Sequence, residues 1–149
     1  MKLAVGGDHC GYRLKAVMVA KLREQGHEVI DHGTFTDTPV DFPDIAKVVC
    51  KSILDGEAER AIMFCGTGVG AAIACNKISG IRASVCHDIH SAHQCVEHDD
   101  VQVMCIGEQI IGYWVAEDLI QAFLKAEFST NEEFRRRVNK LGLMDNSIH

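Results

Sequence analysis

The sequence predicts an α/β fold, a Rossmann-like three-layer sandwich in which helices cover both faces of a five-stranded parallel sheet. Short apolar runs of strand length alternate with longer segments whose apolar residues recur at helical spacing. The composition, 47% hydrophobic and 24% charged, is that of an ordinary globular protein. A chain of 149 residues can bury one core, so we expect a single domain over residues 1–149, with a loose tail from about residue 142 to 149.

The five expected strands are the apolar runs at residues 2–7, 27–31, 61–64, 81–86 and 101–106. The expected helices lie between and after them, at residues 14–22, 45–53, 71–78, 87–97, 111–123 and 131–140, and a polar loop spans residues 33–43. Ligands of such sheets bind beyond the carboxyl ends of the strands. Asp8-His9, Cys65 and His87-Asp88 all follow strands, so we expect them to share one rim. His98 precedes a strand, and the chain must bring it round to reach that rim.

The glycine-rich turn after the third strand, Cys65-Gly66-Thr67-Gly68-Val69-Gly70, carries the sharpest chemical signal. Its glycines allow a sharp turn that leaves several N–H groups unobstructed at the start of a helix. Such groups, aided by the helix dipole, favour negative charge on a ligand or in a transition state. Cys65 stands at the lip of this turn, where the same dipole is expected to make a thiol ionise more easily than a buried one. The turn therefore predicts a base beside an oxyanion cradle.

Charge and cysteine usage exclude several classes of protein. The formal net charge of −6 argues against nucleic-acid binding, which requires a basic face. No apolar run approaches the ~20 residues of a membrane span, and the apolar part of the N-terminus is too short for a signal peptide, so we expect a cytoplasmic protein. The seven cysteines form no C-x-x-C pair, which argues against a disulfide scaffold or a zinc ribbon.

One row of histidines suggests a metal site, but the spacing disfavours it. His87, His90 and His93 recur at every third position. On a helix this row drifts by roughly 60° over six residues, so the three rings do not converge on one ion. We therefore expect no metal.

Three pieces of the chain resemble the ribose-5-phosphate isomerase B family, whose relatives include the galactose-6-phosphate isomerase subunits. They are Gly7-Asp8-His9-x-Gly11, the turn from Cys65 to Gly70 with Asn76-Lys77-x-x-Gly80-Ile81-Arg82, and Ser91-Ala92 followed by His98-x-Asp100. The resemblance is collinear over roughly residues 1–140. The Cys-Gly-Thr-Gly-Val-Gly turn is its most specific part.

The resemblance implies an aldose–ketose isomerase that needs no cofactor and works through a cis-enediolate, with ribose 5-phosphate and ribulose 5-phosphate as the default pair. It implies a homodimer, or a tetramer made of two dimers, with active sites between subunits. Cys65 matches the base that moves the proton, Thr67 its supporting hydroxyl, and His98 and Asp8 the groups that open the sugar ring. The implied substrate contacts are His9, the backbone of Gly66, Gly68, Val69 and Gly70, Asp99 and Arg137. Beyond the resemblance, we expect Arg13 or Arg135 to serve as a replacement phosphate ligand, and Arg13 lies one helical turn after His9.

The chain departs from the family pattern at the end of the substrate remote from the reacting carbons. Gln109 and Glu133 stand where phosphate-binding arginines are usual, whereas Arg137 is retained. Asp99 replaces an asparagine and Phe42 replaces a tyrosine. A tetrose phosphate, a hexose 6-phosphate or an unphosphorylated aldose therefore remain alternative substrates.

Two interpretations from other classes compete with an isomerase. Gly66-x-Gly68-x-x-Ala71 fits a loose dinucleotide-binding pattern, with Asp88 near the distance expected for a ribose contact. In dinucleotide-binding folds this pattern usually follows the first strand of the βαβαβ unit, whereas here it follows the third strand, which argues against this interpretation. The altered phosphate site also fits a non-catalytic sugar-phosphate sensor.

Overall fold

The structure, a computed structural model, describes residues 1–145. Its centre is a parallel sheet of strands β1 (Lys2–Gly7), β2 (Glu28–Asp31), β3 (Arg60–Cys65), β4 (Ala83–Val85) and β5 (Val103–Gly107), in the order β2-β1-β3-β5-β4. The helices are α1 (Tyr12–Glu24), α2 (Phe42–Leu54), α3 (Val69–Asn76), α4 (Ile89–Asp99), α5 (Tyr113–Lys125) and α6 (Glu132–Asp145). The Rossmann-like α/β sandwich predicted from the sequence is confirmed.

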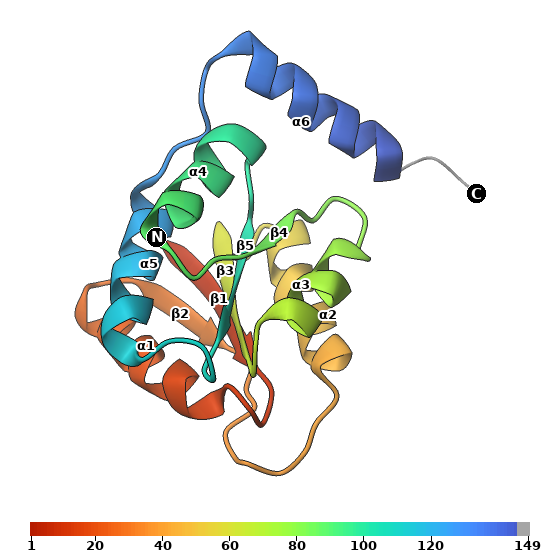
Figure 1. The fold of residues 1–149 in the computed structure, drawn as a ribbon. Coiled ribbons are helices and arrows are strands. Elements are labelled where there is room, and N and C mark those ends of the chain that lie inside the picture. The colour runs from red at the N-terminus through yellow and green to blue at the C-terminus, as the bar shows by residue number, and fades with distance from the viewer. Residues whose placement is uncertain (146–149) are drawn as a thin grey trace.

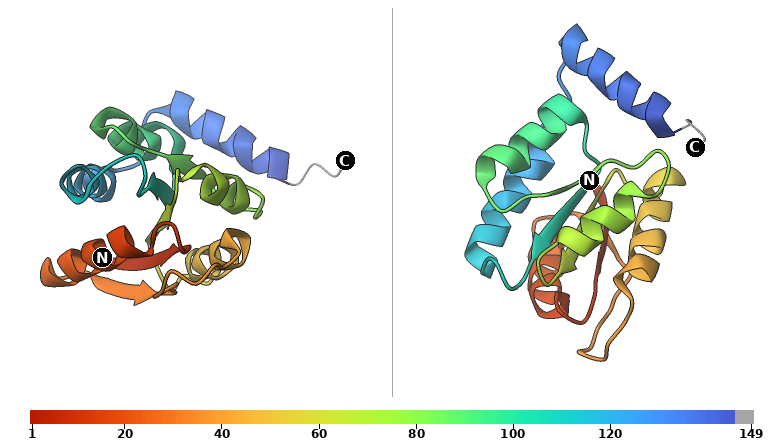
Figure 2. Two further views of the ribbon diagram at one scale, coloured as in Figure 1. Left: turned by 60° about the horizontal axis from the view of Figure 1, so that its bottom comes forward. Right: turned by 45° about the vertical axis from the view of Figure 1, so that its right-hand side comes forward.

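Helices cover both faces of the sheet (Figures 1 and 2), and an apolar core fills each of the two interfaces. Alternate strand residues such as Val5, Phe64 and Ile106 pack with α1, α4 and α5 on one face. Their sequence neighbours, such as Ala4 and Met63, pack with α2 and α3 on the other face. Each central strand is thus buried on both sides, which explains why the strand sequences are continuously apolar rather than alternating.

Helix α6 lies outside this sandwich, beside α4 at the end of the sheet where the strands begin (Figure 1). It corrects the expectation of a loose tail from residue 142, because the helix continues to Asp145. The Asp145 carboxylate accepts a hydrogen bond of 2.7 Å from the N–H of Gly80, in the loop before β4, and this contact fixes the end of the helix. Residues 146–149, the rest of the expected tail, lie outside the described residues.

Several other boundaries differ from the sequence prediction, and three of them have a clear physical reason. Strand β4 holds only residues 83–85, because Arg82 turns to the end of α4 and its N–H is bound by the side chain of Gln102. Helix α4 includes His98 and Asp99, which the sequence placed in a connection to the next strand. Helix α2 begins at Phe42, three residues before the expected start. It includes Pro43 because an N–H in the first turn of a helix has no hydrogen-bond partner within the helix, so proline loses nothing there.

The strand order reverses between β1 and β3, which places a topological switch point between their carboxyl ends. Gly7 pairs with Phe64 and Cys65 pairs with Gly107, so the last residues of β1, β3 and β5 lie side by side. Asp8 and the glycine-rich turn follow directly. No helix within residues 1–145 has the length and apolar character to cross a membrane.

Candidate active site

Cys65 and Asp8 meet at the switch point. The Cys65 thiol donates a hydrogen bond to Asp8 Oδ2 at 3.4 Å, and both side chains are buried, with 8% and 4% of their surfaces exposed. Asp8 Oδ1 accepts the N–H of Cys10 at 2.9 Å, which fixes the carboxylate. A thiol and a carboxylate in contact form a pair through which a proton can pass.

The glycine-rich turn wraps the sulfur of Cys65 with backbone donors. The N–H groups of Gly68 and Gly66 hydrogen-bond to this sulfur and favour its thiolate form. Gly68 has a φ of +81°, a left-handed backbone conformation that is higher in energy for any residue with a side chain than for glycine. Helix α3 begins at the next residue. The Thr67 hydroxyl accepts the N–H of Val69 at 3.3 Å, and the Thr67 side chain is exposed beside the turn.

The expectation of a readily ionised thiol is wrong for this site. Burial raises the pKa of Cys65, and the negative charge of Asp8 raises this pKa further. The N–H groups of Gly68 and Gly66 lower the pKa but do not outweigh these two effects. The helix dipole follows from the sequence, whereas the depth of the sulfur and the carboxylate beside it depend on the folded chain.

We predict that Asp8→Asn lowers the pKa of the Cys65 thiol, because the substitution removes a negative charge next to the sulfur. The measurement is the rate of iodoacetamide alkylation at Cys65 across pH, resolved by peptide mass spectrometry. The rate curve should move to lower pH. Asp55→Asn, which removes an exposed carboxylate at the end of α2 remote from Cys65, is the control variant and should leave the curve in place. A curve that stays in place in Asp8→Asn would mean that the Asp8 carboxylate does not act on the sulfur.

The loop between β5 and α5 closes over the turn from the other side. The N–H groups of Glu108 and Gln109 donate to the carbonyls of Cys65 and Gly66 at 2.9 and 3.0 Å. The carboxamide of Gln109 lies flat on Gly66, and a Cβ at this glycine would be 3.2 Å from three of its atoms. Glu108 in turn accepts the N–H of Leu14 in α1 at 3.1 Å. Gln109 therefore lies against the turn that holds Cys65.

The long loop after β2 contributes a second wall. The Nδ1 atom of His9 accepts the N–H of Val40 at 3.2 Å, which leaves Nε2 of the neutral ring as the donor. The ring of Phe42 lies against Gly70, where a Cβ would be 2.8 Å from it. Arg13 is exposed near this loop and hydrogen-bonds to the Tyr12 hydroxyl.

A buried ion pair that the sequence analysis did not identify anchors this loop. Lys15 is 1% exposed, and its Nζ lies 2.7 and 2.9 Å from the two carboxylate oxygens of Asp31. Asp31 also accepts the N–H of Gly33, and the Lys15 ammonium lies 4.5 Å from the ring centre of Phe35. Lys15 follows Leu14 in a helix with an apolar face. Nothing in this local pattern indicates that Lys15 pairs with Asp31, which lies 16 residues further along the chain.

The remaining candidate residues lie at the opposite end of the sheet from Cys65. Strand β5 begins at Val103, which pairs with Ala61, and ends at Gly107, which pairs with Cys65. The distance between the two ends of this strand is about 13 Å at ~3.3 Å per residue. His98 and Asp99 precede β5, at the end of α4. Arg137 lies on α6 beside α4 (Figure 1). One chain therefore brings together Asp8, His9 and the turn from Cys65 to Gly70 and places the other group of candidates apart.

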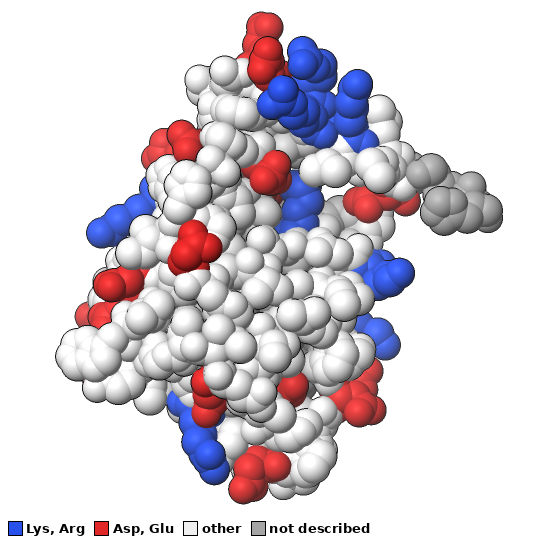
Figure 3. All heavy atoms as spheres, viewed as in Figure 1, with Lys and Arg blue, Asp and Glu red and all other residues white. Residues whose placement is uncertain are grey.

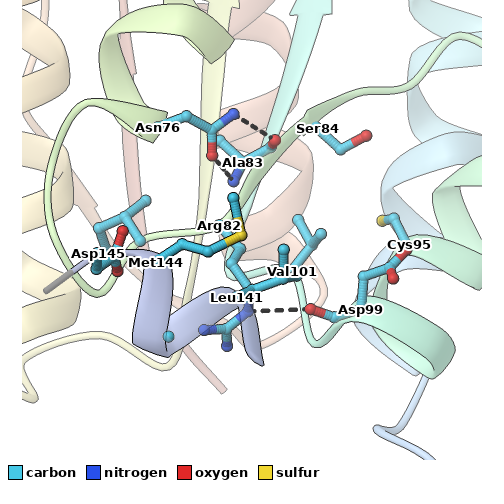
Figure 4. A pocket seen from close by; sticks show the side chains of 12 residues that line it. Asn76, Arg82, Ala83, Ser84, Cys95, Asp99, Val101, Leu141, Met144 and Asp145 are labelled. Atoms are coloured by element: carbon cyan, nitrogen blue, oxygen red, sulfur yellow. Dashed lines mark hydrogen bonds between the residues drawn. The ribbon is translucent and has the colours of Figure 1, made fainter. Parts of the chain in front are cut away.

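Arg82 holds the end of α4 that carries His98 and Asp99. Its guanidinium donates to the carbonyls of Asp99 and Asp100 at 2.7 to 3.0 Å and pairs with the Asp100 carboxylate at 2.8 Å. A hollow of about 480 Å³ lies beside it, between α4, the start of β4 and the end of α6 (Figure 4). Asp99 borders this hollow, which lies away from Cys65.

The histidine row has separate local partners. His87 Nε2 accepts the N–H of Gly107 at 2.8 Å, and burial lowers the pKa of this histidine, so it is a neutral ring that fixes the end of β5. His93 pairs with Glu97 at 3.2 Å. Residues 1–145 contain no group of three side chains placed to hold a metal ion. Asp88 caps α4 by accepting the N–H of Ser91 at 2.8 Å, a local role that does not depend on a ribose.

Comparisons with known proteins agree with this architecture. Residues 3–141 match the model of the ribose/galactose isomerase family. The chain is 40% identical to ribose-5-phosphate isomerase B of Escherichia coli over 135 residues, 91% of each chain. It is 34% identical to the 4-deoxy-4-sulfo-D-erythrose isomerase of a Clostridium species over 156 residues, covering 100% of this chain and 98% of the relative. The structure of Clostridium thermocellum ribose-5-phosphate isomerase B superposes with a TM-score of 0.95 at 40% identity, over 98% of both chains. The chain therefore belongs to the ribose/galactose isomerase family of aldose–ketose isomerases.

Proposed function

We propose that this enzyme interconverts ribose 5-phosphate and ribulose 5-phosphate through a cis-enediolate, with Cys65 as the base. The observation that carries the proposal is the thiol of Cys65 on Asp8 at 3.4 Å, wrapped by the N–H groups of Gly66 and Gly68. The relative from E. coli, whose name gives ribose 5-phosphate as its substrate, supports this pair of sugars. We place the enzyme in the cytoplasm, where the free thiols of its seven cysteines persist.

The proton follows a short path in this mechanism. Asp8 takes the thiol proton of Cys65, and the thiolate removes the proton from C2 of the open-chain aldose. The backbone of the turn from Gly66 to Gly70 stabilises the enediolate oxygen, with Thr67 supporting the cysteine. The thiol then returns this proton to C1, while the hydroxyl proton of O2 passes to the oxyanion on O1, so that C1 carries a hydroxyl and C2 becomes the ketone. Asp8 finally returns its proton to the thiolate of Cys65. The raised pKa of Cys65 makes its thiolate a stronger base but lowers the fraction of thiolate at neutral pH, and the N–H groups of Gly66 and Gly68 offset part of that loss.

His98, Asp99 and Arg137 enter the site from a second copy of the chain. Because they lie at the opposite end of the sheet from Cys65, a homodimer is the arrangement that completes the site. Val69 and Ile73, 52% and 57% exposed, lie one turn apart on α3 directly after the Cys65 turn. A second copy that covers them buries apolar surface and brings its own α4 and α6 close to Cys65.

The distal end of the substrate meets a mixed set of charges. Lys and Arg side chains gather over α6 (Figure 3), among them Arg135, Arg136 and Arg137. Glu133 lies 3.5 Å from Arg137 and offsets its charge, and Gln109 contributes a neutral amide. His9, through Nε2, and Arg13 supply further contacts to an anion.

The pairing of Glu133 with Arg137 favours one alternative substrate class. A phosphate monoester carries nearly two negative charges at neutral pH, whereas a sulfonate carries one. Because the Glu133 carboxylate offsets part of the charge of Arg137, an end group with one negative charge needs less compensation from the other cations than an end group with two. The relative named 4-deoxy-4-sulfo-D-erythrose isomerase gives a concrete member of that class. A sulfonated tetrose is therefore our second candidate substrate.

The test is an isomerase assay with ribose 5-phosphate, erythrose 4-phosphate, 4-deoxy-4-sulfo-D-erythrose, allose 6-phosphate, galactose 6-phosphate and unphosphorylated ribose. We expect ribose 5-phosphate to be turned over with the highest kcat/KM. Preference for the sulfonate would replace the proposed substrate by the second candidate, and preference for free ribose would exclude an anionic end group. No turnover of any sugar would contradict the assignment of Cys65 to isomerisation of these substrates and favour a sensor.

We predict that Glu133→Gln lowers the KM for ribose 5-phosphate roughly threefold and leaves kcat unchanged, because the change removes a negative charge and frees Arg137. Glu132→Gln, at the neighbouring exposed position of the same helix, is the matched control and should change neither parameter. A higher KM in Glu133→Gln would mean that the carboxylate holds Arg137 in its binding position instead of opposing the phosphate.

A further inference from the structure

The ring of Phe134 joins the two groups of α4 and α6 that the proposed site needs. The imidazole of His98 stacks on this ring with 3.9 Å between ring centres and 17° between planes. The guanidinium of Arg137, three residues further along α6, lies 5.9 Å from the same ring centre. One aromatic side chain thus contacts both a proposed ring-opening group and a proposed anion ligand.

We propose that Phe134 is a positioning residue for isomerisation, one that sets the plane of the His98 ring and the place of the Arg137 guanidinium. This inference rests on the proposed function, since it needs His98 and Arg137 in the site.

The stack restricts His98 where other contacts do not. An imidazole on an unrestrained side chain turns about its last torsion, and a group that transfers protons must present one nitrogen in a fixed direction. The nearest carboxylate oxygen, from Glu97, lies 3.8 Å from His98 Nε2, too far for a good hydrogen bond, and it also pairs with His93 at 3.2 Å. Phe134 covers one face of the ring and leaves the nitrogens at its edge accessible.

The rest of α6 keeps Phe134 in this place. Val138, one turn further along, is buried, and the N–H of Ser129 in the segment before the helix donates to the carbonyl of Glu97 at 3.0 Å. These contacts tie α6 to the last turn of α4. The position of the helix therefore does not depend on Phe134 alone, so its ring can be replaced while the helix remains docked.

The experiment compares Phe134→Leu, which keeps an apolar side chain but removes the flat face, with Phe134→Tyr, which keeps the face. Phe128→Leu is the matched control. The Phe128 ring, which precedes α6, lies 4.8 Å from the guanidinium carbon of Arg135 on that helix and does not stack with His98 or Arg137. We expect Phe134→Leu to lower kcat for ribose 5-phosphate about tenfold and to raise KM about threefold, with both values restored in Phe134→Tyr and unchanged in Phe128→Leu. Equal values for the wild type and Phe134→Leu, or equal losses in Phe134→Leu and Phe134→Tyr, would overturn the proposal.

A second readout separates this proposal from the proposed function. The ring current of Phe134 should move the His98 Hε1 resonance upfield in the NMR spectrum, and this displacement should disappear in Phe134→Leu and persist in Phe134→Tyr. A resonance at the same position in all three proteins would overturn the stack itself. A wild-type enzyme that shows the displacement but converts no sugar would refute the proposed function, and the positioning role in isomerisation with it, while leaving the stack in place.

Discussion

Cys65→Ala is expected to reduce isomerisation roughly a thousandfold or more, because the variant lacks the only group proposed to remove the proton from carbon. Cys65→Ser keeps a hydrogen bond to Asp8 but offers a much weaker acid, so we expect it to remain strongly impaired. The measurement is kcat with the preferred sugar, together with deuterium uptake at the reacting carbon in D₂O by NMR. Both should be lost together.

Two controls protect this result. Cys10→Ala removes a thiol near the same carboxylate while keeping the backbone N–H that binds Asp8, so we expect its activity to stay close to that of the wild type. Thermal unfolding of Cys65→Ala should match the wild type within a few degrees, since a small side chain is lost next to a rim and not in the centre of the core. Full turnover by Cys65→Ala would refute the assignment of the base.

Mixing two inactive variants is expected to restore activity. If His98 of one chain acts with Cys65 of the other, a dimer of one Cys65→Ala chain and one His98→Ala chain has one site with both groups and one with neither. Random reassembly makes half of the dimers mixed, so about a quarter of the wild-type activity should return. The chains are mixed after reversible dissociation and activity is assayed in the unfractionated mixture; if the mixed dimer is instead co-expressed with two tags and purified, about half of the wild-type activity should return.

The same mixture would stay inactive if both groups acted within one chain, since each chain lacks one of them. A mixture of Cys65→Ala with Cys65→Ser dimers controls for reassembly and should gain nothing. Recovery therefore supports the site between subunits, and its absence, in a preparation shown to contain mixed dimers, contradicts that arrangement.

Most of the fold could be predicted from periodicity. The five strands are continuous apolar runs because helices cover both faces, and Gly26, Gly56 and Gly80, each with a positive φ, mark the turns after the first three helices. The errors occur where single side chains decide the boundary. Strand β4 is short because Arg82 caps α4, and the last turn of α6 is ordered because Asp145 binds Gly80. A local pattern does not reveal a partner 18 or 65 residues away.

Less of the site could be predicted, because its properties depend on depth and on neighbours. The Cys65 turn was evident from its glycines. The predicted direction of the shift in the thiol pKa was wrong, because burial and the charge of Asp8 raise this pKa more than the backbone N–H groups lower it. Lys15 and Asp31, Phe134 and the Gln109 contact to Gly66 gave no pattern of their own. The roles of His98, Asp99 and Arg137 remain predictions, and only the comparison of their positions with that of Cys65 showed that one chain does not unite them.

The floor of the site is built from main chain alone. Gly107 lies so close to the Cys65 turn that a Cβ would be 2.6 Å from the Cα of Thr67, and a Cβ on Gly11 would be 2.3 Å from the carbonyl carbon of Phe64. A side chain added at Gly11 or Gly107 would therefore displace the backbone of β3 or of the Cys65 turn. Engineering of this enzyme toward other sugars has to act at the periphery, through the loop at residues 33–41, Gln109 and the outer face of α6. The same separation lets residues at the rim change while the centre of proton transfer stays the same, so that sugars differing only at their far end can be exchanged.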